Sequence, residues 1–74
     1  MRVYIGSDLP EVFPVAVNAR REGGHLRISR KSIAYARRKM DLAPENRIEI
    51  LQVPGYGPWV MNAASGDIVA RRER

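Results

Sequence analysis

One stretch decides the fold of this chain: residues 29–40, with the sequence SRKSIAYARRKM. It contains neither glycine nor proline and is rich in residues that favour helices. Ser29 is a good N-cap, because its hydroxyl can accept a backbone N–H from the first helical turn. We therefore predict a helix over residues 30–40. Since each residue turns a helix by about 100°, one side of it carries the small and apolar residues Ser29, Ile33, Ala36 and Met40.

The opposite side of this helix is basic. Its centre carries Lys31, Tyr35 and Arg38, and its flanks carry Arg30, Arg37 and Lys39. Residues 20–39 hold eight lysines and arginines against Glu22 alone, a net charge of +7, although the whole chain carries only +5. Such a concentration of charge attracts nucleic acid or an acidic protein surface. The predicted partner-binding residues are Arg27, Arg30, Lys31, Tyr35, Arg37, Arg38 and Lys39.

Short β-strands are predicted on both sides of the helix. Residues of high β propensity alternate with polar ones over 2–5, 12–21 and 25–28 before it, and over 47–53, 59–62 and 68–71 after it. Gly23-Gly24 supplies a tight turn, so residues 12–21 and 25–28 should form a hairpin, with Pro14 at an edge or a bulge. The three later strands are expected to form a meander.

The economical architecture is a two-layer α+β fold in which one antiparallel β-sheet packs against a single α-helix, in the order β-β-β-α-β-β-β. Seventy-four residues make one domain, 1–74, near the lower size at which an apolar core suffices. The predicted core comprises Val3, Ile5, Phe13, Val15, Val17, Leu26, Ile28, Ile33, Ala36, Met40, Ile48, Ile50, Trp59, Met61 and Ile68.

The composition argues against catalysis and cofactor binding. Without cysteine the chain can form no disulfide and no thiolate zinc site, and one histidine cannot build a multi-histidine metal site. The acids are scattered rather than paired, and His25 follows Gly24 at a hairpin corner, where an exposed turn histidine is expected. We predict a binding protein that is not an enzyme and holds no metal or cofactor.

Two further features are predicted to be structural. Gly55-Tyr56-Gly57 resembles a fragment of a phosphate-binding loop, but it precedes Pro58 and a strand where such loops open a helix. We interpret it as a strand connection. Trp59 is expected in the core, with a surface binding anchor as the alternative. No signal-peptide pattern and no membrane-length apolar run is present, so a cytoplasmic protein without membrane contact is expected. We also expect a monomer.

The run of residues 29–38 (SRKSIAYARR), a strand at 47–50, the Trp59-Val60-Met61 strand, a Gly66 turn and a final basic strand together resemble small phage-encoded anti-CRISPR proteins of type I systems. The similarity is to the type I-F and type I-C inhibitors numbered nine, and it covers residues 25–72. It implies a protein that binds a Cas subunit of a type I surveillance (Cascade) complex and blocks target DNA binding by that complex. The matching basic-patch residues are Lys31, Tyr35, Arg37 and Arg38. The proline-bearing N-terminal strand and residues 54–58 depart from the family pattern, which puts the docking surface in doubt.

Several hypotheses remain open at this point. If the contacted Cas surface were itself basic, the contacts would be acidic, namely Glu22, Asp41, Glu45 and Glu49. The leading hypothesis is an anti-CRISPR inhibitor acting in the bacterial host cytoplasm. The alternative is a small basic domain that uses the same helix on nucleic-acid phosphates without reading sequence. A third is a structural module of a larger assembly.

Overall fold

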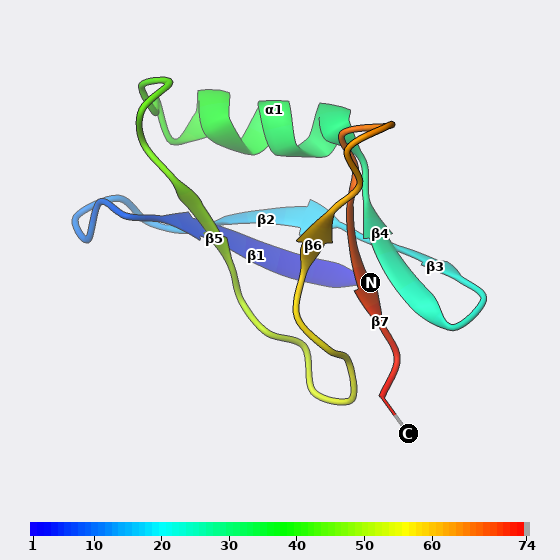
Figure 1. Cartoon of the computed structure of the whole chain (residues 1–74). Coiled ribbons are helices and arrows are strands. Elements are labelled where there is room, and N and C mark those ends of the chain that lie inside the picture. Colours follow the sequence, from blue (N-terminus) through cyan, green and yellow to red (C-terminus); the bar gives the residue numbers. More distant parts are fainter. Residues whose placement is uncertain (74) are drawn as a thin grey trace.

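The computed structural model describes residues 1–73, in which seven strands and one helix follow one another (Figure 1). The elements are β1 (Arg2–Ser7), β2 (Val15–Asn18), β3 (Arg20–Glu22), β4 (His25–Ile28), α1 (Arg30–Lys39), β5 (Ile48–Ile50), β6 (Val60–Met61) and β7 (Ile68–Arg71). The α+β class, the single helix and the antiparallel pairing of strands are therefore confirmed.

The strands form two sheets, so the prediction of one sheet in two layers is wrong. One sheet has the order β2-β1-β5 and the other has the order β3-β4-β7-β6. The predicted meander of the last three strands is also wrong, because β5 pairs with β1, with Ile50 opposite Ile5, while β6 pairs with β7. Alternation of apolar residues looks the same for either partner, which is why the sequence pattern did not separate the sheets.

The chain passes from one sheet to the other at Ala19. This residue is buried, and it ends the β1–β2 ladder, since its N–H donates to the Met1 carbonyl at 2.6 Å and its carbonyl accepts from the Met1 amine at 2.9 Å. The next residues pair with β4 instead, across the predicted Gly23-Gly24 turn, where Gly23 has φ 59°. The predicted strand over 12–21 is thus two strands joined by a bend, as at the corner of a β-sandwich.

Helix α1 begins and ends with recognisable caps. Ser29 is the N-cap as predicted, and its Oγ accepts from the Ser32 N–H at 3.2 Å. At the other end Asp41 adopts a left-handed conformation with φ 53°, its N–H donates to the Arg38 carbonyl, and the Leu42 N–H donates to the Arg37 carbonyl. This pair of hydrogen bonds is a Schellman motif, which closes the helix one residue before the predicted end.

The core lies between the two sheets and beneath α1. Its buried apolar residues are Val3, Ile5, Val17, Ala19, Leu26, Ile28, Ala36, Met40, Ile68 and Ala70. Val15, Ile33, Ile48, Ile50 and Trp59 were also predicted there and are partly buried against it. Trp59 Nε1 donates to the Leu51 carbonyl at 3.2 Å, and residues 51–59, including Gly55-Tyr56-Gly57, connect β5 to β6 as expected.

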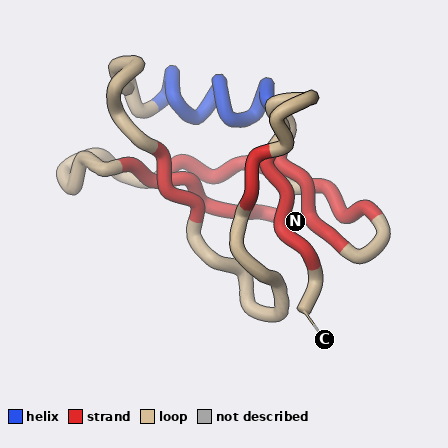
Figure 2. Tube along the Cα trace, in the orientation of Figure 1, coloured by secondary structure: helices blue, strands red, loops and turns tan. Residues whose placement is uncertain are grey.

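Two predicted core residues are on the surface. Phe13 is 88% exposed because it lies in the connection between β1 and β2, which has no regular secondary structure (Figure 2). Met61 is 63% exposed because β6 is a two-residue strand at the edge of its sheet. The Phe13 error follows from extending an apolar alternation beyond the residues that pair, whereas Met61 does pair, with Ile68, but on an edge strand that nothing covers enough to bury it.

Candidate functional site

The outer side of α1 is a basic surface. Ala36 and Met40 are buried, and the side chains exposed on the other side are those of Arg30, Lys31, Tyr35, Arg38 and Lys39, which we call the basic helix face. Tyr35 is 45% exposed at its centre. The two-sided helix that the sequence predicted is therefore confirmed, and five of the seven predicted partner-binding residues share this face.

The charge of the basic helix face is not balanced by acids. Within residues 1–73 the ion pairs join Glu22 to Arg20, His25 and Arg27, and Asp67 to Arg27, so none involves a cation of α1. The first helical turn contains Arg30 and Lys31 and no acid. Cations in the first turn are repelled by the positive end of the helix dipole. The basic residues of the last turn lie at its negative end, where their charge is favourable. The helix dipole therefore does not favour the first-turn cations, although the charge of Arg30, after the hydrogen bonds from its own backbone N–H and from Arg27, contributes to lowering the pKa of Asp67.

Arg37 has a structural contact instead. It is half-buried, and its Nη2 donates to the Ala43 carbonyl at 2.8 Å, which fastens the segment after the helix to the last turn of α1. It is the one predicted cation of α1 whose side chain turns away from the basic helix face.

A shallow groove continues the basic helix face toward the sheet. Lys31, Ser32 and Tyr35 line a hollow of about 320 Å³ together with β2, along which α1 runs (Figure 1). A second hollow, of about 280 Å³, lies against the same β2 residues and is lined in addition by Arg2. The β2 residues shared by both hollows are Ala16, Val17 and Asn18. We call these two hollows the β2 groove. Sequence patterns do not predict it, because it depends on where the helix crosses the strand.

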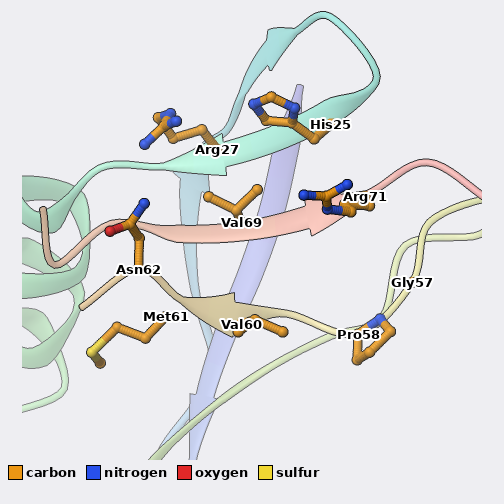
Figure 3. A pocket seen from close by; sticks show the side chains of 9 residues that line it. All are labelled: His25, Arg27, Gly57, Pro58, Val60, Met61, Asn62, Val69 and Arg71. Atoms are coloured by element: carbon orange, nitrogen blue, oxygen red, sulfur yellow. The ribbon is translucent and has the colours of Figure 1, made fainter. Parts of the chain in front are cut away.

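His25 is not the exposed turn histidine that was expected. Its side chain is 34% exposed, and it lines a depression of about 420 Å³ on the outward face of the four-stranded sheet, together with Arg27 and Arg71 (Figure 3). Its Nε2 lies 4.0 Å from Glu22 Oε1. Periodicity in the sequence does not predict this depression, because its residues come from three strands and two connections.

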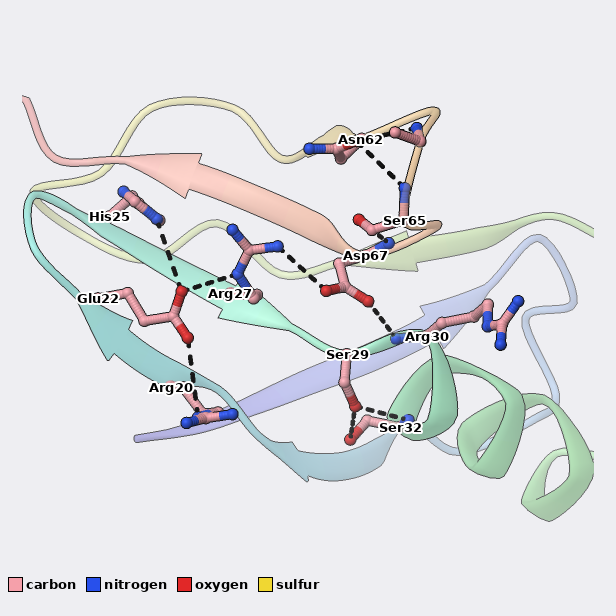
Figure 4. Close-up of polar contacts among 11 residues, drawn as sticks. Arg20, Glu22, His25, Arg27, Ser29, Arg30, Ser32, Asn62, Ser65 and Asp67 are labelled. Atoms are coloured by element: carbon pink, nitrogen blue, oxygen red, sulfur yellow. Dashed lines mark hydrogen bonds and ion pairs between the residues drawn. The ribbon is translucent and has the colours of Figure 1, made fainter.

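Arg27 lies in an ion-pair network on the sheet, apart from the cations of α1 (Figure 4). Its Nε donates to Glu22 Oε1 at 2.9 Å and its Nη1 to Asp67 Oδ2 at 3.0 Å. The hydrogen bond to Glu22 and then that to Asp67 raise the pKa of Arg27 above its ordinary value. The backbone N–H of Arg30 and then the Arg27 guanidinium lower the pKa of Asp67. The network joins β3, β4 and the start of α1.

The alternative acidic contacts come from separate elements of the fold. Glu22 belongs to the network just described, Asp41 closes the helix, Glu45 follows in the next connection and Glu49 is exposed on β5.

Comparison with known proteins identifies no relative. No family model, no curated protein and no solved structure matches this chain. Among residues 1–73, no cluster of histidine and acidic side chains could hold a metal ion, and no helix is long and apolar enough to cross a membrane. The resemblance to type I anti-CRISPR proteins therefore stays a prediction.

Proposed function

We propose that this domain binds nucleic acid through the basic helix face and the β2 groove, without reading base sequence. The observation that carries the proposal is the absence of any ion pair to a cation of α1 within residues 1–73. Unpaired, exposed cations are free to replace the counterions of a phosphate backbone, and this replacement supplies most of non-specific binding.

The dimensions of the helix fit this role. Lys31 and Arg38 are seven residues apart, about 10 Å along a helix, and successive phosphates of one strand lie closer together than this. Cations at both ends of α1 could thus contact different phosphates of the same strand. Tyr35, between them, lines the β2 groove and offers an aromatic face on which a base can stack.

Sequence reading is not part of the proposal. The basic helix face consists of lysines, arginines and one tyrosine, and Asn18, the one amide side chain that lines the β2 groove, accepts a hydrogen bond from the Met1 amine through its Oδ1. Contacts of these cations with phosphates position a protein on the backbone but do not distinguish bases. We further propose that the domain acts as a monomer in the bacterial host cytoplasm and has no catalytic activity.

The test is fluorescence anisotropy with labelled oligonucleotides at several salt concentrations. Four exposed cations on α1 predict a slope of about −3 in a plot of log affinity against log salt for single strands, which is a loss of roughly 50-fold between about 50 and 200 mM salt. The double variant Lys31→Gln/Arg38→Gln should lose about tenfold in affinity and show about half the slope.

The matched control is Arg21→Gln/Arg47→Gln, which removes the same charge from exposed positions on β3 and before β5. It should retain most of the affinity. Equal losses in the two double variants would mean that net charge alone attracts the nucleic acid, and a salt-insensitive interaction would contradict phosphate binding.

The anti-CRISPR hypothesis makes a different prediction in the same assay. An inhibitor lowers the affinity of a purified type I surveillance complex for its target DNA at protein concentrations where the domain alone leaves that DNA unbound. If such inhibition occurs and is lost in Lys31→Gln/Arg38→Gln, the partner of the basic helix face is a Cas subunit. If the domain binds DNA and never affects the complex, the nucleic-acid proposal stands alone.

A further inference from the structure

The outward face of the four-stranded sheet has a regular arrangement that the basic helix face does not use. Leu26 and Ile28 of β4 point into the core, so the residues between them and before them point outward. The register puts His25 opposite Arg71 and Arg27 opposite Val69, and Val69 is in turn opposite Val60 of β6. Side chains opposite one another on one face of a sheet are direct neighbours.

These neighbours enclose the depression of about 420 Å³, which has two unlike walls (Figure 3). One wall carries the nitrogen-bearing side chains of His25, Arg27 and Arg71. The other consists of Pro58 and Val60, and Val60 is 61% exposed. Val69 lies between the walls. Exposed apolar side chains beside hydrogen-bond donors are typical of a site for a ligand that is itself part apolar and part charged.

The two arginines in the wall formed by His25, Arg27 and Arg71 differ in whether their charge is already compensated by an acid. Arg27 is compensated by Glu22 and Asp67, which also hold its guanidinium in place. Arg71 is exposed and makes no side-chain hydrogen bond or ion pair with residues 1–73. Apart from the His25 imidazole, this wall therefore carries one uncompensated positive charge, that of Arg71. The planar guanidinium of Arg71 can form two parallel hydrogen bonds to a carboxylate.

We infer that this depression binds a carboxylate attached to a compact apolar group, with the carboxylate on Arg71 and the apolar group against Pro58 and Val60. A dianionic phosphate fits less well, because its second charge would lie near the carboxylates of Glu22 and Asp67. The same chemistry is offered by a small carboxylic acid and by the C-terminal residue of a peptide. The inference is independent of the proposed function, since the two surfaces share no residue.

The experiment is an NMR titration of the ¹⁵N-labelled protein with N-acetyl-leucine. Its matched control is N-acetyl-leucinamide, which keeps the apolar group and lacks the charge. The acid should shift the amide signals of β4, β6 and β7 around the depression, while the amide should bind about tenfold more weakly. A peptide ending in leucine, with a free or an amidated C-terminus, then distinguishes a peptide end from a free acid as the source.

Three variants locate the contact. Arg71→Gln should weaken N-acetyl-leucine about tenfold, and Val60→Thr, which is nearly the same shape, should weaken it by a smaller factor. Arg38→Gln on α1 should leave it unchanged. The side chains of Val60 and Arg71 are exposed, so both variants should keep the fold. The ¹⁵N NMR spectrum of each variant verifies this. Equal binding of the amide, tighter binding of inorganic phosphate at the same residues, or an unaffected Arg71→Gln variant would each overturn the inference.

Discussion

The carboxylate of Asp67 accepts a hydrogen bond from the backbone N–H of Arg30 at 2.8 Å. That N–H belongs to the first turn of α1, where backbone donors have no partner within the helix. The same carboxylate binds Arg27 at 3.0 Å, so one side chain from the turn before β7 connects the helix to the sheet. Next to it, Gly66 has φ 79°, and an added Cβ there would lie 3.0 Å from Arg30 Cδ. The close approach of the turn before β7 to Arg30 thus depends on a glycine at position 66.

We expect Asp67→Asn to lower the stability of the domain in a pH-dependent way. The pKa of Asp67 lies below its ordinary value of 3.8, because the folded state favours the ionised carboxylate. Its contribution is therefore fully present above that value and disappears as the pH falls through the lower, folded-state pKa. Urea unfolding midpoints of the two proteins should differ at about pH 7 and about pH 5, and the difference should shrink as the pH falls below 3.8 and through the lower folded-state pKa. A difference that persists in acid would contradict an electrostatic origin.

Asp41→Gly should stabilise the domain. Asp41 has φ 53°, a left-handed conformation that glycine adopts without steric cost, and its negative charge lies at the negative end of α1. We expect an increase of about 0.5–1 kcal/mol in the free energy of unfolding, measured by urea denaturation. Asp41→Asn is the control, since it removes the charge and keeps the side chain. An equal gain in both variants would assign the effect to charge alone.

The elements that the sequence predicted correctly are those whose signals are local. Ser29 and the glycine-free run after it specify α1, and the residues of β4 and β7 were predicted with their observed bounds. The switch at Ala19 could not be predicted, because it consists of hydrogen bonds to Met1, eighteen residues away. Non-local pairing of this kind leaves no periodic pattern in the chain.

The two candidate sites differ in the same respect. The basic helix face could be predicted, because the helical period alone brings Lys31, Tyr35 and Arg38 to one side. The depression could not, since it needs the register that sets His25 opposite Arg71. The sequence indicated that each residue belongs to a strand, but not that the two strands are neighbours.

Phe13→Ser should have almost no effect on stability, although the sequence pattern suggested a core residue. The side chain is 88% exposed, and surface substitutions of this kind change the free energy of unfolding by about 0.5 kcal/mol or less. Leu26→Ala is the contrast, because Leu26 is fully buried and truncation of such a residue costs about 2–5 kcal/mol. The stabilities of the two variants are compared by thermal unfolding, which is monitored by circular dichroism. A large loss in Phe13→Ser would mean that the 8–14 connection packs against the core.

Tyr35→Ala should weaken the binding of single-stranded nucleic acid more than the binding of double-stranded nucleic acid. A base can stack on the Tyr35 ring in the β2 groove only where it is unpaired, and such stacking contributes about 1–3 kcal/mol per base. The variant should therefore bind an oligothymidylate about tenfold more weakly and a duplex of equal length almost as well as the unchanged protein.

Tyr35→Phe is the matched control, because it keeps the ring and removes only the hydroxyl. It should bind both ligands like the unchanged protein, in anisotropy titrations at one salt concentration. If Tyr35→Phe is as defective as Tyr35→Ala, the hydroxyl rather than the ring makes the contact. If neither variant changes the ratio of the two affinities, the cations of α1 act alone, and the domain binds single strands and duplexes through the same phosphate contacts.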